Sequence, residues 1–105
     1  MDLTLFLLGN LVEGQKTVSD TGPDQTYFVI KRGPYEVSVV EWTFKTGYKN
    51  YSYHVKVGSE YILCSESSVE KAEDAIKIIN NSLRKYLKEK SSVEEYYLYS
   101  DFKEL

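Results

Sequence analysis

Two side chains are the first candidates for chemistry, because each is the only one of its type in the sequence: His54 and Cys64. A serine–histidine nucleophile requires His54, and strand alternation places Ser38 of a neighbouring predicted strand opposite it. A catalytic triad also needs an orienting acid and an oxyanion hole, and no motif in the sequence supplies either one. The sequence therefore predicts no catalytic residues. A small-ligand-binding protein or minor enzyme centred on His54 is the alternative.

Cofactor and metal sites are not indicated either. The sequence contains no glycine-rich phosphate loop, no GxGxxG and no HExxH motif. A single cysteine excludes an internal disulfide, a two-cysteine redox motif and a thiolate zinc site. The start, MDLTLFLLGN, has an acid at position 2 and an apolar run far shorter than a membrane span. These features predict a cytoplasmic protein without cofactor, metal or membrane contact.

Composition limits the class of protein. The length of 105 residues predicts one domain, 1–105, and 42% apolar with 28% charged residues is ordinary for a globular chain. The net charge of −3 disfavours a general nucleic-acid binder, which would carry a basic excess. Tyrosine is enriched, at 10 residues, and its ring with a polar end suits half-buried strands and binding surfaces.

Four antiparallel strands are predicted from alternating side chains and turn residues. Their ranges are 26–32, 35–44, 48–57 and 60–66, joined at Gly33-Pro34, at KTG (45–47) and at Gly58-Ser59. With tight turns, one face of the sheet is predicted to collect Phe28, Ile30, Val37, Val39, Tyr53, Val55, Ile62 and Cys64. This face needs a cover, so its side chains, including the tyrosine at position 53, are expected in the core.

An amphipathic helix over residues 65–90 is predicted to supply that cover, because apolar residues recur there at helical spacing. Ser67 and Glu70 have the spacing of a capping box. Acids crowd the start of the segment and bases its end, in agreement with the helix macrodipole.

The remaining segments complete an α+β fold: a four-stranded antiparallel meander sheet packed on one long C-terminal amphipathic helix. The apolar N-terminal segment (Leu3, Leu5, Phe6, Leu7, Leu8, Leu11) is predicted beside the sheet, as a helix or extra strand. Residues 13–25 are rich in turn formers and predict a loop. The tail after Ser92 predicts a short helix, with an edge strand as the alternative.

The second face of the predicted sheet poses a problem. Lys31, Glu36 and Lys56 form a cross-strand charge row there. The rest of this face is too apolar for an ordinary wet surface: Tyr27, Val29, Val40, Trp42, Phe44, Tyr48, Tyr61 and Leu63. Three explanations are considered, in this order. The N-terminal segment packs there, a bulge near Val40 and Glu41 turns the later residues inward, or a partner covers the face.

Protein binding is the function that these features predict. The tail joins carboxylates to aromatic rings, which suits a partner with a basic surface. The predicted contact residues of the tail are Glu94, Glu95, Tyr96, Tyr97, Tyr99, Asp101 and Phe102. A second predicted contact, for a partner or a homodimer, comprises Trp42, Phe44 and Tyr48. Small acidic inhibitors, immunity-type antidotes and phage counter-defence proteins share this composition.

A single-stranded nucleic-acid-binding module is a further alternative. It would combine stacking on the sheet aromatics with the basic end of the helix, Arg84, Lys85, Lys88 and Lys90. The macrodipole already explains bases at that end, and the net charge makes nucleic acid an unlikely partner.

Overall fold

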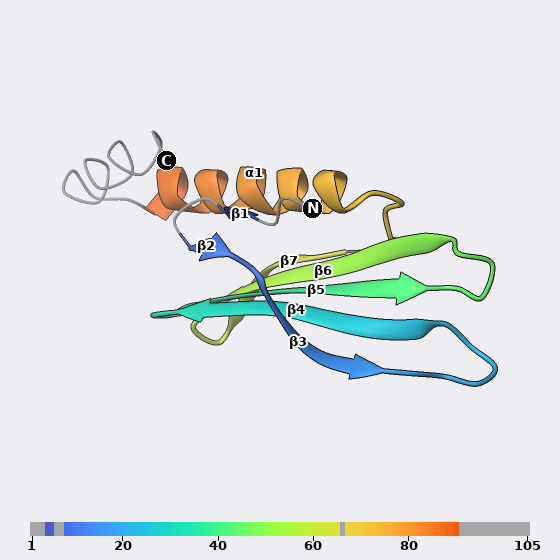
Figure 1. The fold of residues 1–105 in the computed structure, drawn as a ribbon. Helices are drawn as coiled ribbons and strands as arrows, with labels where there is room; N and C mark the ends of the chain where they lie inside the picture. Colours follow the sequence, from blue (N-terminus) through green and yellow to red (C-terminus); the bar gives the residue numbers. More distant parts are fainter. Residues whose placement is uncertain (1–3, 6–7, 66, 91–105) are drawn as a thin grey trace.

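The computed structural model describes residues 4–5, 8–65 and 67–90, and has an α+β architecture (Figure 1). A short hairpin of β1 (Thr4–Leu5) and β2 (Gly9–Asn10) comes first. An antiparallel sheet of five strands follows in the order β3-β4-β5-β6-β7, and then the helix α1 (Ala72–Lys90). The strands are β3 (Val12–Thr17), β4 (Asp24–Arg32), β5 (Tyr35–Thr43), β6 (Lys49–Val57) and β7 (Glu60–Cys64).

The register of the central strands β4, β5 and β6 agrees with the prediction. Val37 pairs with Ile30 of β4 and with Val55 of β6. The two-residue turn at Gly33-Pro34 helps to set the register of β4 and β5, and Gly33 adopts the positive φ (60°) that such a turn requires. Gly47, in the turn between β5 and β6, also has a positive φ (88°). The buried side chains on the helix-facing side of these strands are Thr26, Phe28, Val37, Val39, Tyr51 and Val55.

The predicted loop over residues 13–25 is wrong in its first part, because β3 forms there as a fifth strand. All six residues of β3 are exposed, so it lacks the alternation of buried and exposed side chains by which a strand is recognised in a sequence. Backbone pairing with β4 holds it at the edge of the sheet. A shift of register between Glu13 and Lys16 interrupts this pairing.

The predicted position of Cys64 is wrong because the pairing of β6 with β7 also contains a shift of register. Ile62 is an extra residue on β7. Cys64 therefore pairs with His54 and not, as predicted, with Tyr53. A shift of one residue moves a side chain to the opposite face, and Cys64, predicted in the core, is exposed. Leu63, predicted on the other face, packs against the core together with Ile62.

The helix begins at Ala72 rather than at residue 65, so the predicted capping box of Ser67 and Glu70 is wrong. Val69 instead forms a bridge to β6. Tyr51 N–H donates to the Val69 carbonyl at 2.8 Å, and Val69 N–H donates to the Tyr51 carbonyl at 2.9 Å. This pairing needs extended backbone, which excludes helical dihedral angles at Val69.

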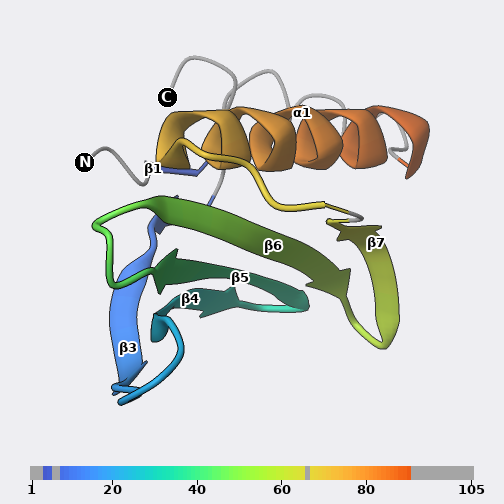
Figure 2. The same cartoon turned by 90° about the vertical axis from the view of Figure 1, so that its right-hand side faces the viewer.

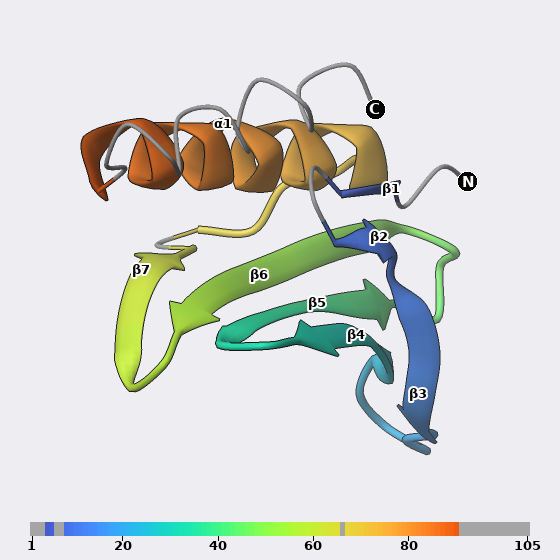
Figure 3. The same cartoon turned by 90° about the vertical axis from the view of Figure 1, so that its left-hand side faces the viewer.

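One side of the sheet carries both α1 and the N-terminal hairpin (Figures 2 and 3). The helix packs mainly on β6 and β7, where Ile79 and Leu83 are fully buried. Leu5, Leu8 and Leu11 are buried in the same core cluster. The N-terminal segment is thus a hairpin that leads into the extra strand β3. Positions 3, 6 and 7 of the apolar run, and the predicted helix in the tail, lie outside the described residues.

Because β1 contributes to the core, Leu5→Ala should destabilise the protein by about 2–5 kcal/mol, the usual range for deleting a buried leucine side chain. Chemical denaturation followed by circular dichroism measures the effect. Val18→Ala is the control, since Val18 is 70% exposed and should change stability by less than about 0.5 kcal/mol. Equal unfolding midpoints for the two variants would contradict the docking of β1.

Candidate functional site

The face of the sheet that points away from α1 has no helix or strand packed on it in the described part of the chain. We call this surface the open face. Alternation and the observed register assign to it Val12, Tyr27, Val29, Lys31, Glu36, Ser38, Val40, Trp42, Ser52, His54, Lys56, Tyr61 and Cys64. Val12 and Tyr61 are 63% and 57% exposed, and Tyr27 and Val29 are each 37% exposed. Val12, Tyr27 and Val29 thus lie on neighbouring strands in solvent, and Tyr61 is exposed at the opposite edge of the face.

Two of the three explanations for this apolar face are wrong. Leu5, Leu8 and Leu11 of the N-terminal segment lie on the helix side, where they are part of the core between α1 and the sheet. A bulge near Val40 and Glu41 does not occur, because β5 pairs with both neighbours in unbroken register from Tyr35 to Thr43. Cover by a partner, the third explanation, stays a prediction.

His54 borders a shallow cavity of about 210 Å³ on the open face. As predicted, Ser38 lies opposite it, with Oγ 2.8 Å from Nε2 and 3.1 Å from Nδ1 of the ring. Ser52 and Cys64 line the same cavity, and no carboxylate is among its lining residues. A serine or cysteine nucleophile there therefore has no orienting acid. The sequence could not associate Cys64 with this cavity, because nothing in it marks the extra residue on β7.

Metal binding has no candidate cluster either, since no three His, Cys, Asp or Glu side chains gather within residues 4–5, 8–65 and 67–90.

Aromatic rings on the open face are held by polar neighbours. Trp42 Nε1–H donates to Ser52 Oγ at 3.3 Å, which satisfies the indole on a half-buried side chain. Lys56 Nζ lies 5.5 Å from the centroid of the Tyr61 ring, and His54 meets the same ring edge-on at 5.6 Å. These contacts restrict the rings while leaving apolar surface accessible.

The structure separates the three residues of the predicted sheet contact. Trp42 belongs to the open face, whereas Phe44 and Tyr48 lie in the β5–β6 hairpin with ring centroids 5.7 Å apart. Tyr48 Oη–H donates to Glu70 Oε1 at 3.1 Å, next to the start of α1. Desolvation, followed by this hydrogen bond, raises the pKa of Tyr48 above its usual value. Tyr48 is therefore tied to the segment before the helix and is not part of the open face.

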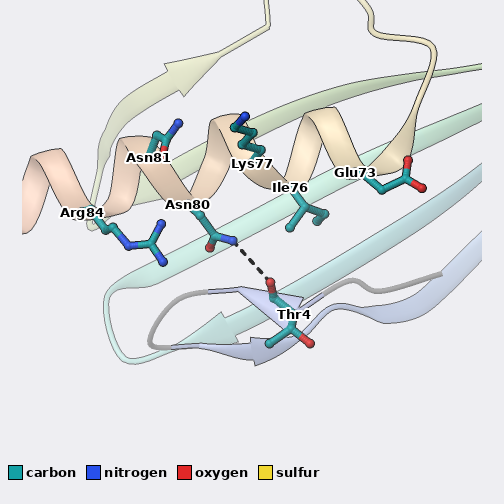
Figure 4. A pocket seen from close by; sticks show the side chains of 7 residues that line it. All are labelled: Thr4, Glu73, Ile76, Lys77, Asn80, Asn81 and Arg84. Carbon is teal, nitrogen blue, oxygen red and sulfur yellow. Dashed lines mark hydrogen bonds between the residues drawn. The ribbon is translucent and has the colours of Figure 1, made fainter. Parts of the chain in front are cut away.

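The basic residues of α1 lie away from the open face. Arg84 and Lys77 line a groove of about 310 Å³ between the helix and β1 (Figure 4). In this groove Asn80 Nδ2–H donates to the Thr4 carbonyl at 3.4 Å, and Glu73 adds an opposing charge. The groove is polar and of mixed charge.

Lys85 lines a different groove, next to Tyr61 at the edge of the sheet. Glu60 and Glu89 line it too, so acids offset the cation there. The structure therefore provides no continuous basic track from the helix end to the sheet aromatics among the described residues. The predicted contact residues of the tail, 94–97, 99 and 101–102, lie outside the described part of the chain.

A tyrosine–carboxylate pair stabilises the end of the inner face. Tyr51 Oη–H donates to Glu41 Oε2 at 2.9 Å, and Lys49 Nζ lies 3.8 Å from the other oxygen of that carboxylate. Burial is the main cause that raises the pKa of Tyr51 to about 12, and the neighbouring Glu41 contributes.

Comparisons with known proteins reveal no relative: no family model, curated protein or solved structure matches the chain. Among the described helices none is both long and apolar enough to cross a membrane. Class and function therefore have to be argued from the fold and from the open face.

Tyr51→Phe should lower the free energy of unfolding by about 1 kcal/mol at pH 8, since Glu41 loses its hydrogen-bond donor. Folding raises the pKa of Tyr51 from 10.0 to about 12, so its neutral form is favoured in the folded state. This stabilisation is complete below pH 10 and is lost as the pH rises through 12. The parent should therefore lose stability between pH 10 and 12 more steeply than Tyr51→Phe.

Urea unfolding at several pH values measures the difference between parent and variant. Tyr27→Phe, at an exposed position, serves as the control. Parallel stability curves for parent and Tyr51→Phe above pH 10 would contradict the assigned hydrogen bond.

Proposed function

We propose that this protein is a non-catalytic protein-binding module that makes its contact with the open face. The observation that carries the proposal is the group of exposed apolar side chains on neighbouring strands β3 and β4 of this face, Val12, Tyr27 and Val29, with Tyr61 exposed at the β7 edge of the same face. Contiguous apolar surface of this kind costs free energy in water and marks an interaction site in a folded protein.

The composition of the open face fits a protein partner. Its centre combines tyrosine and tryptophan with valine, and its charged residues lie in one row, Lys31, Glu36 and Lys56, across the strands. Aromatic residues are enriched and charges depleted at the centre of protein interfaces. The absence of a carboxylate or metal cluster at the His54 cavity supports binding rather than turnover.

A finer proposal concerns the kind of protein. Of the 16 acids and 13 bases, four acids and one base lie in residues 91–105, which leaves 12 of each in residues 1–90. The net charge of −3 is therefore the charge of the tail. Such a tail suits a basic partner, so we propose a cytoplasmic inhibitor or antidote. Its residues Glu94, Glu95, Tyr96, Tyr97, Tyr99, Asp101 and Phe102 would contact that partner.

Single-stranded nucleic acid is the second candidate ligand. The placement of Lys56 over Tyr61 favours it, because stacking beside a cation suits a nucleotide. The balanced charge of residues 1–90 also weakens the objection drawn from the net charge. Against it, Glu36 lies between Lys31 and Lys56, Lys77 and Arg84 line a groove away from the open face, and Glu60 and Glu89 accompany Lys85 beside Tyr61. Protein binding is the better-supported function.

Photo-cross-linking in expressing cells tests the open face directly. With p-benzoylphenylalanine in place of Val29, illumination should yield a covalent protein adduct of defined mass. The matched control carries the same amino acid in place of Val18, which is also exposed but lies in the connection between β3 and β4. Identical adducts from both positions, or none from position 29, would contradict the proposal. An adduct that nuclease removes would support nucleic-acid binding instead.

Truncation after Ser92 tests the finer proposal about the tail. Affinity capture from host lysate should retain one basic protein with the intact chain and lose it with the truncated chain. Circular dichroism must first show that the truncated chain folds. Retention of the same protein without the tail would remove the tail from the contact. A specific turnover abolished by one substitution in a folded variant would overturn the non-catalytic assignment.

A further inference from the structure

The charged side chains of the open face are arranged so that the face is complementary to the same face of a second copy. Lys31 of β4 pairs in register with Glu36 of β5, and Lys56 of β6 follows in the same row. Among the described ion pairs, none within 4.0 Å involves Lys31 or Glu36. The adjacent strands β4 and β5 thus carry opposite charges at the same position along the strand direction. Each of the two charged side chains remains available to another molecule.

A twofold axis that runs along the strands, between β4 and β5, would place β4 of one copy over β5 of another. Such a rotation leaves the position of each residue along the strand direction unchanged. Each residue of β4 or β5 therefore faces, in the second copy, the residue with which it pairs in its own sheet. Lys31 would then face Glu36 of the partner subunit, and the reciprocal pair would form by symmetry. In the next row, Val29 would face Ser38 of the partner subunit, and in the row after that Tyr27 would face Val40 of the partner subunit. Opposite charges meet in the first of these rows, and apolar side chains meet in the third.

The size of the open face suits such a contact. Five strands about 4.8 Å apart, with central strands of nine residues at about 3.3 Å each, give a footprint of about 600 Å². Two copies would bury about 1,200 Å² in total, which is the lower end of stable, specific interfaces. Packing of two twisted sheets face to face is a common way to bury such surfaces.

The sheet edges are poorer routes to association. β3 is interrupted by a register shift between Glu13 and Lys16, and β7 has only five residues and an extra residue at Ile62. Bulges and short edge strands oppose strand addition. The face, rather than either edge, is therefore the surface on which a second copy fits.

We infer that the open face is the interface of a twofold homodimer, with β4 of one copy packed over β5 of the other. Lys31 and Glu36 form two reciprocal ion pairs, and Tyr27, Val29 and Val40 form the apolar centre. This inference rests on the proposed function, since it names the protein that the open face contacts.

Charge reversal with the purified chain tests the inference. The parent should sediment at twice the monomer mass of 12.2 kDa. Lys31→Glu and Glu36→Lys each create two like-charge contacts in a homodimer, and each should weaken dimerisation at least about tenfold. An equimolar mixture of the two variants should recover the dimer, because every intermolecular contact then joins opposite charges. Lys77→Glu, an exposed charge reversal on α1, is the control and should dimerise like the parent.

The equimolar mixture distinguishes the loss of an intermolecular contact from a defect in folding. Repulsion between positions 31 and 36 within each chain persists in the mixture, so recovery requires a contact between chains. A monomeric parent at all concentrations, variants that dimerise normally, or a mixture that stays monomeric would overturn the inference. If the parent is monomeric while position 29 cross-links to another protein, the proposed function stands without the homodimer. If position 29 gives no protein adduct as well, both proposals fail.

Discussion

The width of a helix is the constraint on which this structure depends. An α-helix about 10 Å across covers roughly two strands spaced 4.8 Å apart, and the sheet has five. α1 accordingly packs on β6 and β7, and the N-terminal leucines Leu5, Leu8 and Leu11 complete the cover on the same side. In the described part of the chain no segment is left for the other side. The open face is thus the side of the sheet on which the described residues place no covering segment.

β5 contributes side chains to both faces of the sheet. Its odd-numbered residues Val37 and Val39 are buried beneath the helix layer, while its even-numbered residues Ser38, Val40 and Trp42 face outward. A central strand with apolar residues on both sides is expected when both sides of a sheet are covered. The outward Val40 and Trp42 of β5 are therefore consistent with the proposed interface. The Ser38–His54 contact places a polar pair on the same surface.

Much of the fold could be predicted from the sequence because its local determinants are strong. Gly33 and Gly47 permit tight turns, and alternation on either side of them sets the register of β4, β5 and β6. The Ser38–His54 pair and the charge row of Lys31, Glu36 and Lys56 followed from the same register. The apolar second face was also predicted from the sequence, but the first two explanations given for it, packing of the N-terminal segment and a bulge in the second predicted strand, were wrong. Those explanations failed because Leu5, Leu8 and Leu11 pack on the helix side and because β5 pairs with both neighbours without a bulge.

What the sequence by itself determined is the pairing of the central strands, since turn geometry and alternation are local properties of the chain. Only the tertiary structure decided the rest. β3 exists because the β4 edge offers backbone partners, although its own side chains are all exposed. Cys64 faces outward because β7 takes up an extra residue, and α1 starts late because Val69 pairs with Tyr51. In each case a backbone hydrogen bond to a distant segment decides the outcome, and backbone groups are the same in every residue except proline.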